Sequence, residues 1–288
     1  CTRYLARRIT PIMNNPSFAF IGAGNMATSL IGGLIANGCK PDRIRVSDPE
    51  SGQLDRLHRS FPVQTLQNNS DVVANSDAVV IAVKPHDLKQ VAEEIAGAVR
   101  QHHPLVITIA AGIREPDVRR WLGGDVAIVR AMPNTPALVQ SAATALYPNK
   151  AVDSNQRDLA ESVMRAVGLV VWVDDESLMD AVTALSGSGP AYFFLFMEFL
   201  QEAGEDLGLP AETARLLALQ TAFGAAKMAL ESSEDPEELR KRVTSPGGTT
   251  EQAIGVFEQG KLRELVFNAL HAAHDRSEDL ATQLGESK

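Results

Sequence analysis

The first half of the chain alternates between short apolar runs and stretches whose apolar residues recur at helical spacing. The runs 18–21, 78–83 and 105–109 are almost free of polar residues, which is typical of central strands in a parallel sheet covered on both faces. Helical spacing follows them, for example over 88–99 and 115–122. Strands that alternate with helices in this way predict a parallel, doubly wound sheet. Further strands are expected at 43–48, 126–132, 144–147 and 169–173, with another helix at 156–167.

The pattern changes after residue 173, where strand-like runs stop and long helical patterns begin. Ser188 is expected to cap the first of these helices, with Pro190 in its first turn. Residues 191–197 are apolar around the whole helix circumference and are too few to span a membrane. Such a helix needs burial on every side. We therefore expect a second subunit to cover it, and the core of a monomeric bundle is the alternative.

Further helices are expected over 211–231 and 262–284, and the mixed charge of the last one predicts a solvated C-terminal end. Between them, Pro246-Gly247-Gly248 leads into a helix that begins with threonines. A flexible glycine turn ahead of a threonine-capped helix exposes backbone N–H groups that suit one carboxylate. A simple helix cap with a glycine loop is the alternative.

Composition changes the picture mainly by excluding partners. The chain of 288 residues is 44% hydrophobic and 22% charged, and its formal net charge is −9. This acidic balance, without a basic run, argues against nucleic acid or an anionic membrane as a partner. Residues 1–12 hold three arginines and lack the apolar core of a secretory signal. We expect them to be an upstream extension ahead of Met13.

Cysteine and histidine usage predicts neither a disulfide framework nor a metal site. Only Cys1 and Cys39 are present, which is typical of a protein in a reducing cytoplasm. Cys39 is expected to be a packing residue. His271 and His274 are three positions apart, but no cysteine or carboxylate is expected at ligand spacing beside them.

A glycine-rich turn after the first strand predicts a dinucleotide site. Gly22 permits the turn, Gly24 lets a diphosphate approach the backbone, and Ala27 lets the following helix pack on the strand. The N–H groups at the start of that helix would hold the diphosphate.

The end of the second strand leaves the choice between NAD and NADP open. Asp48 follows Gly22 by 26 positions, where a carboxylate can accept the ribose 2′-OH and would repel a 2′-phosphate. Ser47, Ser51 and nearby arginines could instead bind phosphate, and Asp48 could cap the helix after Pro49.

Ligands of a doubly wound sheet bind beyond the carboxyl ends of its strands. The segments 84–85, 110–112 and 134–136 follow three of the expected strands, so we expect them to line the nicotinamide side of one crevice. For Lys84, a solvated position ahead of a helix is the alternative.

From residue 13 to about residue 284, the chain resembles the pyrroline-5-carboxylate reductases. The resemblance rests on motifs at 20–27, 82–85, 110–112 and 130–136, and most specifically on 180–192 and 243–250. It implies an N-terminal Rossmann domain over 13–173 and an all-α C-terminal dimerisation domain over 174–288. It also implies a homodimer, and decamers are frequent in the family.

The resemblance further implies reduction of (S)-1-pyrroline-5-carboxylate to L-proline, the last step of proline biosynthesis, with NADPH or NADH as cofactor. With Ser47 and Asp48 from the second strand, the cofactor residues are expected to be Ile21, Gly22, Ala23, Gly24, Asn25, Met26, Asn69, Ala82, Val83, Lys84, Pro85, Ala110, Ala111 and Gly112. The substrate residues are expected to be Glu176, Ser245, Gly247, Gly248, Thr249 and Thr250. Arg242 occupies a position near the cofactor that is often neutral in the family.

The substrate is a cyclic imine that carries a carboxylate. We expect the N–H groups of Gly248, Thr249 and Thr250 to hold the carboxylate, and the Thr250 hydroxyl to bond the ring nitrogen. The two anion sites are expected to face one another across a cleft. A β-hydroxyacid dehydrogenase would need a lysine on the interface helix, and the helix after Ser188 begins without one. A non-catalytic dinucleotide sensor is the remaining alternative.

Overall fold

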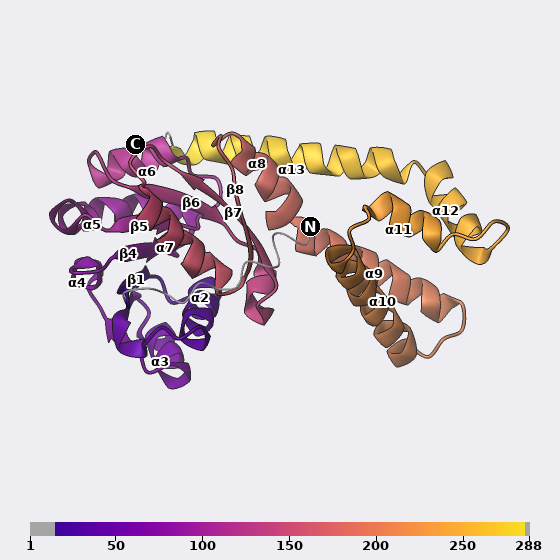
Figure 1. Cartoon of the computed structure of the whole chain (residues 1–288), viewed down its shortest axis with the longest axis horizontal. Coiled ribbons are helices and arrows are strands. Elements are labelled where there is room, and N and C mark those ends of the chain that lie inside the picture. The colour runs from indigo at the N-terminus through magenta and orange to yellow at the C-terminus, as the bar shows by residue number, and fades with distance from the viewer. Residues whose placement is uncertain (1–14, 286–288) are drawn as a thin grey trace. The chain divides into compact units, whose positions relative to one another are not determined.

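The computed structural model describes residues 15–285, and these pack as two compact units (Figure 1). The helical unit comprises Ser188–Ala272. The sheet unit comprises 15–187 together with 273–285. These packing units do not coincide with the domain boundary expected at residue 173, because a short helix after that residue and the end of the last helix both pack on the sheet unit.

An eight-stranded sheet organises the sheet unit, in the order β3-β2-β1-β4-β5-β6-β7-β8. All neighbouring strands are parallel except β6 and β7, which are antiparallel. The strands are β1 (Phe18–Ile21), β2 (Ile44–Ser47), β3 (Gln64–Leu66), β4 (Ala78–Ile81), β5 (Leu105–Thr108), β6 (Ile128–Met132), β7 (Ala142–Pro148) and β8 (Gly168–Trp172).

Helices cover both faces of this sheet, as the doubly wound pattern predicted. One hydrophobic core lies under α2 (Asn25–Ala36), α3 (Ser51–Ser60) and α7 (Ser154–Arg165). The other lies under α4 (Asn69–Val73), α5 (Leu88–His102) and α6 (Glu115–Leu122). The sheet unit also contains three short 3₁₀ helices, η1 (Pro41–Arg43), η2 (Pro85–Asp87) and η3 (Thr135–Val139).

The antiparallel strand β7 was not anticipated. Residues 133–141 connect it to β6, and a parallel crossover needs a connection of about a dozen residues or more. The short link therefore reverses the chain. The longer link through α7 then allows β8 to run parallel to β7.

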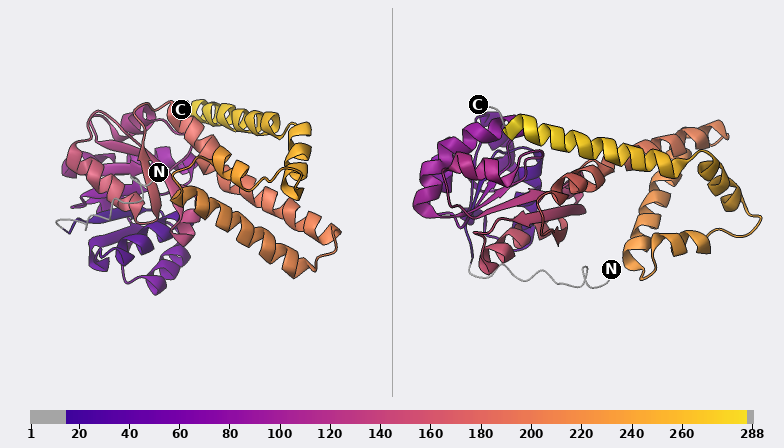
Figure 2. Two further views of the ribbon diagram at one scale, coloured as in Figure 1. Left: turned by 45° about the vertical axis from the view of Figure 1, so that its right-hand side comes forward. Right: turned by 90° about the horizontal axis from the view of Figure 1, so that it is seen from above.

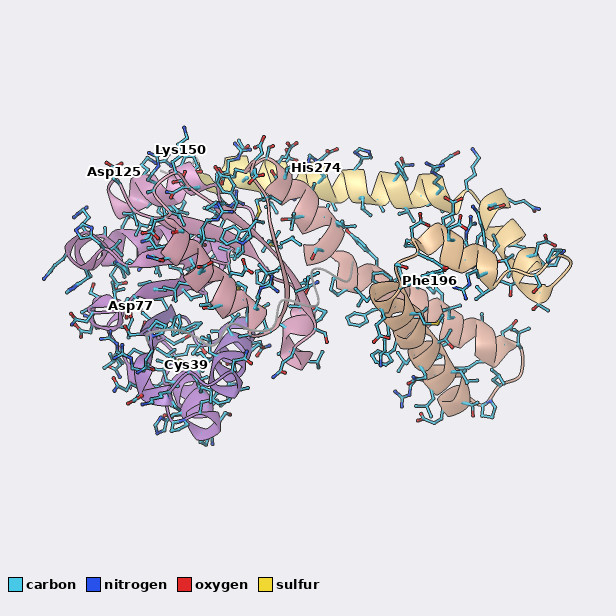
Figure 3. The ribbon with its side chains drawn as sticks, in the orientation of Figure 1. Cys39, Asp77, Asp125, Lys150, Phe196 and His274 are labelled. Atoms are coloured by element: carbon cyan, nitrogen blue, oxygen red, sulfur yellow. The ribbon has the colours of Figure 1, made fainter. Side chains whose placement is uncertain are left out.

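The helical unit consists of long helices with little apolar burial. It contains α9 (Gly189–Asp206), α10 (Ala211–Glu231), α11 (Pro236–Arg242), α12 (Thr249–Gln259) and the first half of α13 (Leu262–Gly285). Helices α9 and α10 lie side by side in an antiparallel hairpin (Figure 2). Phe196 of α9, labelled in Figure 3, contacts Phe257 of α12 with ring centroids 6.1 Å apart.

Ser188 is the N-cap residue of α9 and Pro190 lies in the first turn, as expected, but the side chain of Ser188 does not cap the helix. Helix α8 (Leu178–Val182) and a π-helical turn, η4 (Thr183–Gly187), precede it. Ser188 has helical backbone angles, φ −83° and ψ −20°, and its side chain makes no capping hydrogen bond. The π-helical turn η4 therefore leads directly into α9. Because the backbone is already helical at Ser188, its side chain is not needed to begin the helix.

The solvated end expected for the last helix is confirmed for its charged positions, such as Asp275, Arg276 and Glu278, but one side of this end is buried. Ser277 and Ala281 are 3% and 2% exposed, and both belong to the sheet unit. The Ser277 hydroxyl donates to Oδ1 of Asp180 at 2.6 Å, and Arg120 donates to the carbonyl of Gly285 at 3.0 Å. Small residues four positions apart form a stripe that packs closely, and the charged positions lie around it.

Cys39 is buried in the core on the α2 side of the sheet, as expected of a packing residue (Figure 3). Within the described range, no helix combines the length and apolar character that crossing a bilayer requires.

Candidate active site

The glycine turn after β1 leaves no room for a side chain at its first position. Gly22 has φ +99°, and a Cβ built on it would lie 2.6 Å from the carbonyl oxygen of Ala82. Its N–H donates to the carbonyl of Ser47 at 2.8 Å, and the N–H of Ala82 donates to the carbonyl of Ile21 at 2.8 Å. The turn therefore sits tightly between the ends of β2 and β4.

The next glycine opens onto free space. Gly24 is the N-cap of α2, and a Cβ built on it meets nothing within 4 Å. The N–H groups of Asn25, Met26 and Ala27 have no hydrogen-bond partner in the part of the chain that the structure describes. Three unpaired N–H groups at a helix N-terminus, beside an open glycine, fit a diphosphate.

Asp48 is bound to the turn itself. Its Oδ2 accepts the N–H of Ala23 at 2.8 Å, and its Oδ1 accepts the N–H of Glu50 at 2.8 Å. The N-cap of α3 is Glu50 and no side chain caps that helix, so the alternative role of Asp48 as a helix cap is wrong.

Ser47 and Asn69, both predicted to bind the cofactor, are bonded to each other beside this turn. The hydroxyl of Ser47 donates to Oδ1 of Asn69 at 2.7 Å. The amide of Asn69 donates in turn to Glu94 at 2.9 Å.

The other predicted cofactor segments follow β4 and β5 at the same edge of the sheet. Val83 lies 3.4 Å from the Cβ position of Gly22, and exposed Lys84 precedes Pro85, the first residue of η2. The segment Ala110–Gly112 follows β5, and Gly112 has φ +69°. The sheet therefore brings these segments and the glycine turn to one rim.

Asn134 is a residue at this rim that sequence reasoning did not single out by itself. Its amide donates to the carbonyl of Ser186 at 3.1 Å, and its Oδ1 accepts the N–H of Ala143 at 3.0 Å. The side chain thereby ties the end of β6 to β7 and to η4. Its place in a Pro-Asn-Thr-Pro turn was the only signal in the sequence.

The predicted substrate loop has a different hydrogen-bond pattern from the one expected. The N–H of Gly248, which was expected to bind a carboxylate, instead donates to the carbonyl of Ser245 at 3.0 Å in this structure. Thr249 is the first residue of α12 and not its cap, which is Gly248. The N–H groups of Thr249, Thr250 and Glu251 have no partner among the described residues, so the helix N-terminus still offers three donors.

Glu176, expected near the substrate, is held by a buried cation. Its Oε1 lies 2.5 Å from Nη1 of Arg130 in β6 and accepts the N–H of Glu115. Burial raises the pKa of the neighbouring Tyr147 hydroxyl, and the negative charge of Glu176 raises it further. Arg130 was missed as a partner because a charged residue inside an apolar strand gives no indication of where its ion pair lies.

Carboxylates do lie beside one of the C-terminal histidines, contrary to expectation. His274, Asp275 and Glu278 place one potential ligand atom each within 4.8 Å of one another. The two carboxylates are exposed, and all three residues lie on one helix (Figure 3 labels His274). Such groups are common on solvated helices, so the absence of a metal stays a prediction.

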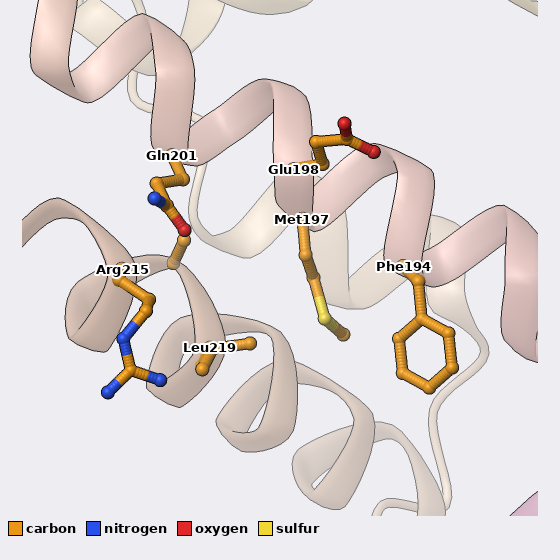
Figure 4. A pocket seen from close by; sticks show the side chains of 7 residues that line it. Phe194, Met197, Glu198, Gln201, Arg215 and Leu219 are labelled. Carbon is orange, nitrogen blue, oxygen red and sulfur yellow. The ribbon is translucent and has the colours of Figure 1, made fainter. Parts of the chain in front are cut away.

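A shallow pocket of about 250 Å³ lies between α9 and α10 (Figure 4). None of the predicted site residues contributes to it. It is lined by Phe194, Met197, Glu198, Gln201, Arg215, Ala218 and Leu219.

Both parts of the chain match models of known protein families. Residues 176–280 match the family model described as "Pyrroline-5-carboxylate reductase dimerisation". Residues 17–112 match the one described as "NADP oxidoreductase coenzyme F420-dependent". The helical unit therefore lies within a dimerisation segment, and the glycine turn lies within an oxidoreductase segment.

Individual relatives resemble the chain over nearly its whole length. A pyrroline-5-carboxylate reductase from Pseudomonas aeruginosa is 50% identical over 95% of this chain and 100% of its own. One from Glycine max is 38% identical over 92% of this chain and 96% of its own.

Solved structures of such enzymes are similar as well. A pyrroline-5-carboxylate reductase from Coxiella burnetii has a TM-score of 0.90 and 52% identity, covering 93% of this chain and 99% of its own. A pyrroline carboxylate reductase from Plasmodium falciparum, solved with NADP bound, has a TM-score of 0.82 and 30% identity, covering 93% and 99%. The chain thus belongs to the pyrroline-5-carboxylate reductase family, which makes it an oxidoreductase.

Proposed function

We propose that the glycine turn holds the diphosphate of NAD(P)H and that loop 245–250 holds the carboxylate of pyrroline-5-carboxylate. The reaction is the one characteristic of the family, reduction of the cyclic imine to L-proline at the end of proline biosynthesis. The observation that carries this proposal is the pair of helix N-termini, at α2 and α12, each with three N–H groups that lack a partner among the described residues.

The open position above Gly24 supports the first assignment. A diphosphate can approach the backbone there, and the N–H groups of Asn25 to Ala27 can bond its oxygens. Val83 to Pro85 and Ala110 to Gly112 would then lie along the nicotinamide half of the cofactor.

The start of α12 supports the second assignment. The N–H groups of Thr249 and Thr250 are available for a carboxylate, with Ser245 and Gly247 shaping the turn before them. Helix N-termini favour an anion through both their N–H groups and their dipole.

When bound, NAD(P)H supplies the hydride that reduces the imine carbon. The residues of this chain hold and orient the substrate, and its ring nitrogen ends protonated. We assign the Thr250 hydroxyl to a hydrogen bond with that nitrogen. An imine is basic enough to be protonated from water, so no histidine or carboxylic acid is required near it. Glu176 is expected to act at a distance, through Arg130 and the start of α6.

We expect the homodimer to assemble further into a decamer and the protein to reside in the cytoplasm. The apolar circumference of α9 supports dimerisation, and the acidic composition with two cysteines supports the location. Sedimentation equilibrium of the purified protein would test the decamer, and cell fractionation would test the location.

Oxidation of NADH or NADPH in the presence of pyrroline-5-carboxylate tests the proposal directly. Proline should form in equal amount to the cofactor consumed. Cofactor binding without any turnover would instead favour the non-catalytic sensor, and turnover of a β-hydroxyacid would favour the other dehydrogenase class.

A further inference from the structure

The rim where the adenosine ribose of the cofactor would lie carries several carboxylates. This inference rests on the proposed function, since it concerns the same cofactor site. The turn after β2 carries Asp48 and Glu50, and the adjoining Asn69 is bonded to Glu94. A 2′-phosphate is bound by cations and by free hydrogen-bond donors, so its affinity for this rim depends on how many of each the rim offers.

Asp48 is fixed in place by both of its oxygens. Backbone N–H groups from the glycine turn and from Glu50 each donate to it at 2.8 Å. Rotating the carboxylate away would leave the N–H of Ala23, a buried residue, without its partner. The negative charge therefore stays at the end of β2.

The side chains of Ser47 and Asn69, which lie at this rim, are already engaged. The hydroxyl proton of Ser47 goes to Asn69, and an amide proton of Asn69 goes to Glu94. This chain of hydrogen bonds ends on a carboxylate, so it adds negative charge to the rim.

Two of the three arginines closest in sequence are held by acceptors on other segments of the chain. Arg45 donates to the hydroxyl of Ser76 at 2.9 Å, and Arg43 donates to the carbonyl of Asn15 at 3.0 Å. Arg56 donates through Nε to the carbonyl of Gly52 at 3.2 Å, which keeps its guanidinium near the start of α3, where its charge opposes the carboxylates of Asp48 and Glu50. Across residues 15–285, neither Asp48 nor Glu50 forms an ion pair.

The start of α3 is the remaining source of donors. Ser51 is its first residue, and the N–H groups of Ser51 and Gly52 have no partner among the residues described. Their attraction for a phosphate is opposed by the carboxylates at positions 48 and 50. Removing one carboxylate should therefore expose the attraction that the helix start provides.

We infer that Asp48 is the specificity-determining residue of the cofactor site and that the protein uses NADH in preference to NADPH. The fixed carboxylate accepts a ribose 2′-OH and repels a 2′-phosphate. We expect kcat/KM for NADH to exceed that for NADPH by about tenfold, which is about the effect of one repulsive pair of charges that are largely exposed to water.

The experiment measures kcat/KM for both cofactors with pyrroline-5-carboxylate, and the Kd of both by calorimetry without substrate. Wild type is compared with Asp48→Asn, Asp48→Ser and Asp55→Asn. Asp55 is an exposed residue of α3, so its variant changes the net charge equally at a position outside the rim. Both Asp48 variants should lower the ratio of NADH to NADPH efficiency at least about fivefold, because each removes the carboxylate that would repel a 2′-phosphate. Asp55→Asn should leave this ratio unchanged.

A wild-type preference for NADPH would overturn the inference, and so would an unchanged ratio in both folded Asp48 variants. The wild-type comparison requires no variant to fold. Tighter binding of NADH with no turnover would support this inference and count against the proposed function, so the two can fail separately.

Discussion

Glu251 reaches back one turn and accepts the N–H of Gly247 at 2.7 Å. Gly247 has φ +73°, and the N-cap, Gly248, has no side chain with which to close the turn. The carboxylate of Glu251 is therefore the side-chain clamp on the proposed substrate loop. It resembles one half of a capping box, in which the third helical residue bonds the backbone before the helix.

Replacing Glu251 with alanine should raise KM for pyrroline-5-carboxylate about fivefold, because a lost capping interaction of about 1 kcal/mol lets the glycine turn sample other conformations. KM for the cofactor and kcat should stay near wild type. Glu251→Gln retains an acceptor and should be milder, and Glu258→Gln, on the far end of α12, is the control. A lower KM in both Glu251 variants would mean that the carboxylate repels the substrate.

Variants of the adjacent Thr249 and Thr250 can distinguish a role of the side chain in substrate binding from a role of the backbone N–H. Thr250→Ala should lower kcat/KM at least about tenfold, since it removes a hydrogen bond to the reacting imine, while the Kd of the cofactor stays the same. Thr249→Ala keeps its backbone N–H and should have little effect, and Thr250→Ser should restore most of the activity. Steady-state kinetics and cofactor titration test this, and unchanged turnover in Thr250→Ala would remove Thr250 from the mechanism.

Alanine substitutions at the two glycines of the cofactor turn should have different effects, one on stability and the other on cofactor binding. Gly22→Ala places a Cβ 2.6 Å from a backbone oxygen at φ +99°, and should lower the free energy of unfolding by about 1–3 kcal/mol. Gly24→Ala has open space and an ordinary φ of −70°. Its methyl group should weaken cofactor binding and leave the melting temperature unchanged, because it occupies space that the diphosphate needs. Thermal unfolding with cofactor calorimetry distinguishes the two, and equal losses of stability would contradict the assignment.

The exposed aromatic face of α9 should be covered by the partner subunit. Phe194 is 63% exposed in one protomer and lines the pocket between α9 and α10 (Figure 4). Phe194→Asp should convert the dimer to monomers in sedimentation velocity, because burying an unpaired charge in an apolar interface costs several kcal/mol. Phe194→Leu keeps an apolar side chain and should remain dimeric. A dimeric Phe194→Asp protein would place this face outside the interface.

The buried thiol of Cys39 makes stability depend on alkaline pH. Burial raises its pKa to about 11, whereas an unfolded chain ionises the thiol near its ordinary value of about 8.5. The stabilisation is complete below the ordinary value and is lost as the pH rises toward the folded one. The Cys1→Ser protein should therefore lose stability relative to the double variant Cys1→Ser, Cys39→Ala between about pH 8.5 and pH 11. Urea unfolding across this range measures the difference, and a constant difference would contradict it.

Much of the fold follows from the pattern of the chain. The apolar runs of β1, β4 and β5 and the helical spacing of α5 and α6 predicted the covered, doubly wound sheet, and the structure confirms it. These features are local, because a strand buried on both faces must be apolar at every position. The direction of β7 could also have been predicted, from the short connection before it.

The candidate site shows which features could not be predicted from the sequence. Spacing predicted anion-binding turns at Gly22, Gly24 and Thr250, because such turns depend on residue types a few positions apart. The sequence did not predict which residues far apart along the chain are hydrogen-bond partners. Only the tertiary structure pairs Arg130 with Glu176, ties Asp48 to Ala23 and docks Ser277 on Asp180. Secondary structure and turns reflect local propensity, whereas the partner of a buried polar group depends on which distant segments the packed core brings beside it.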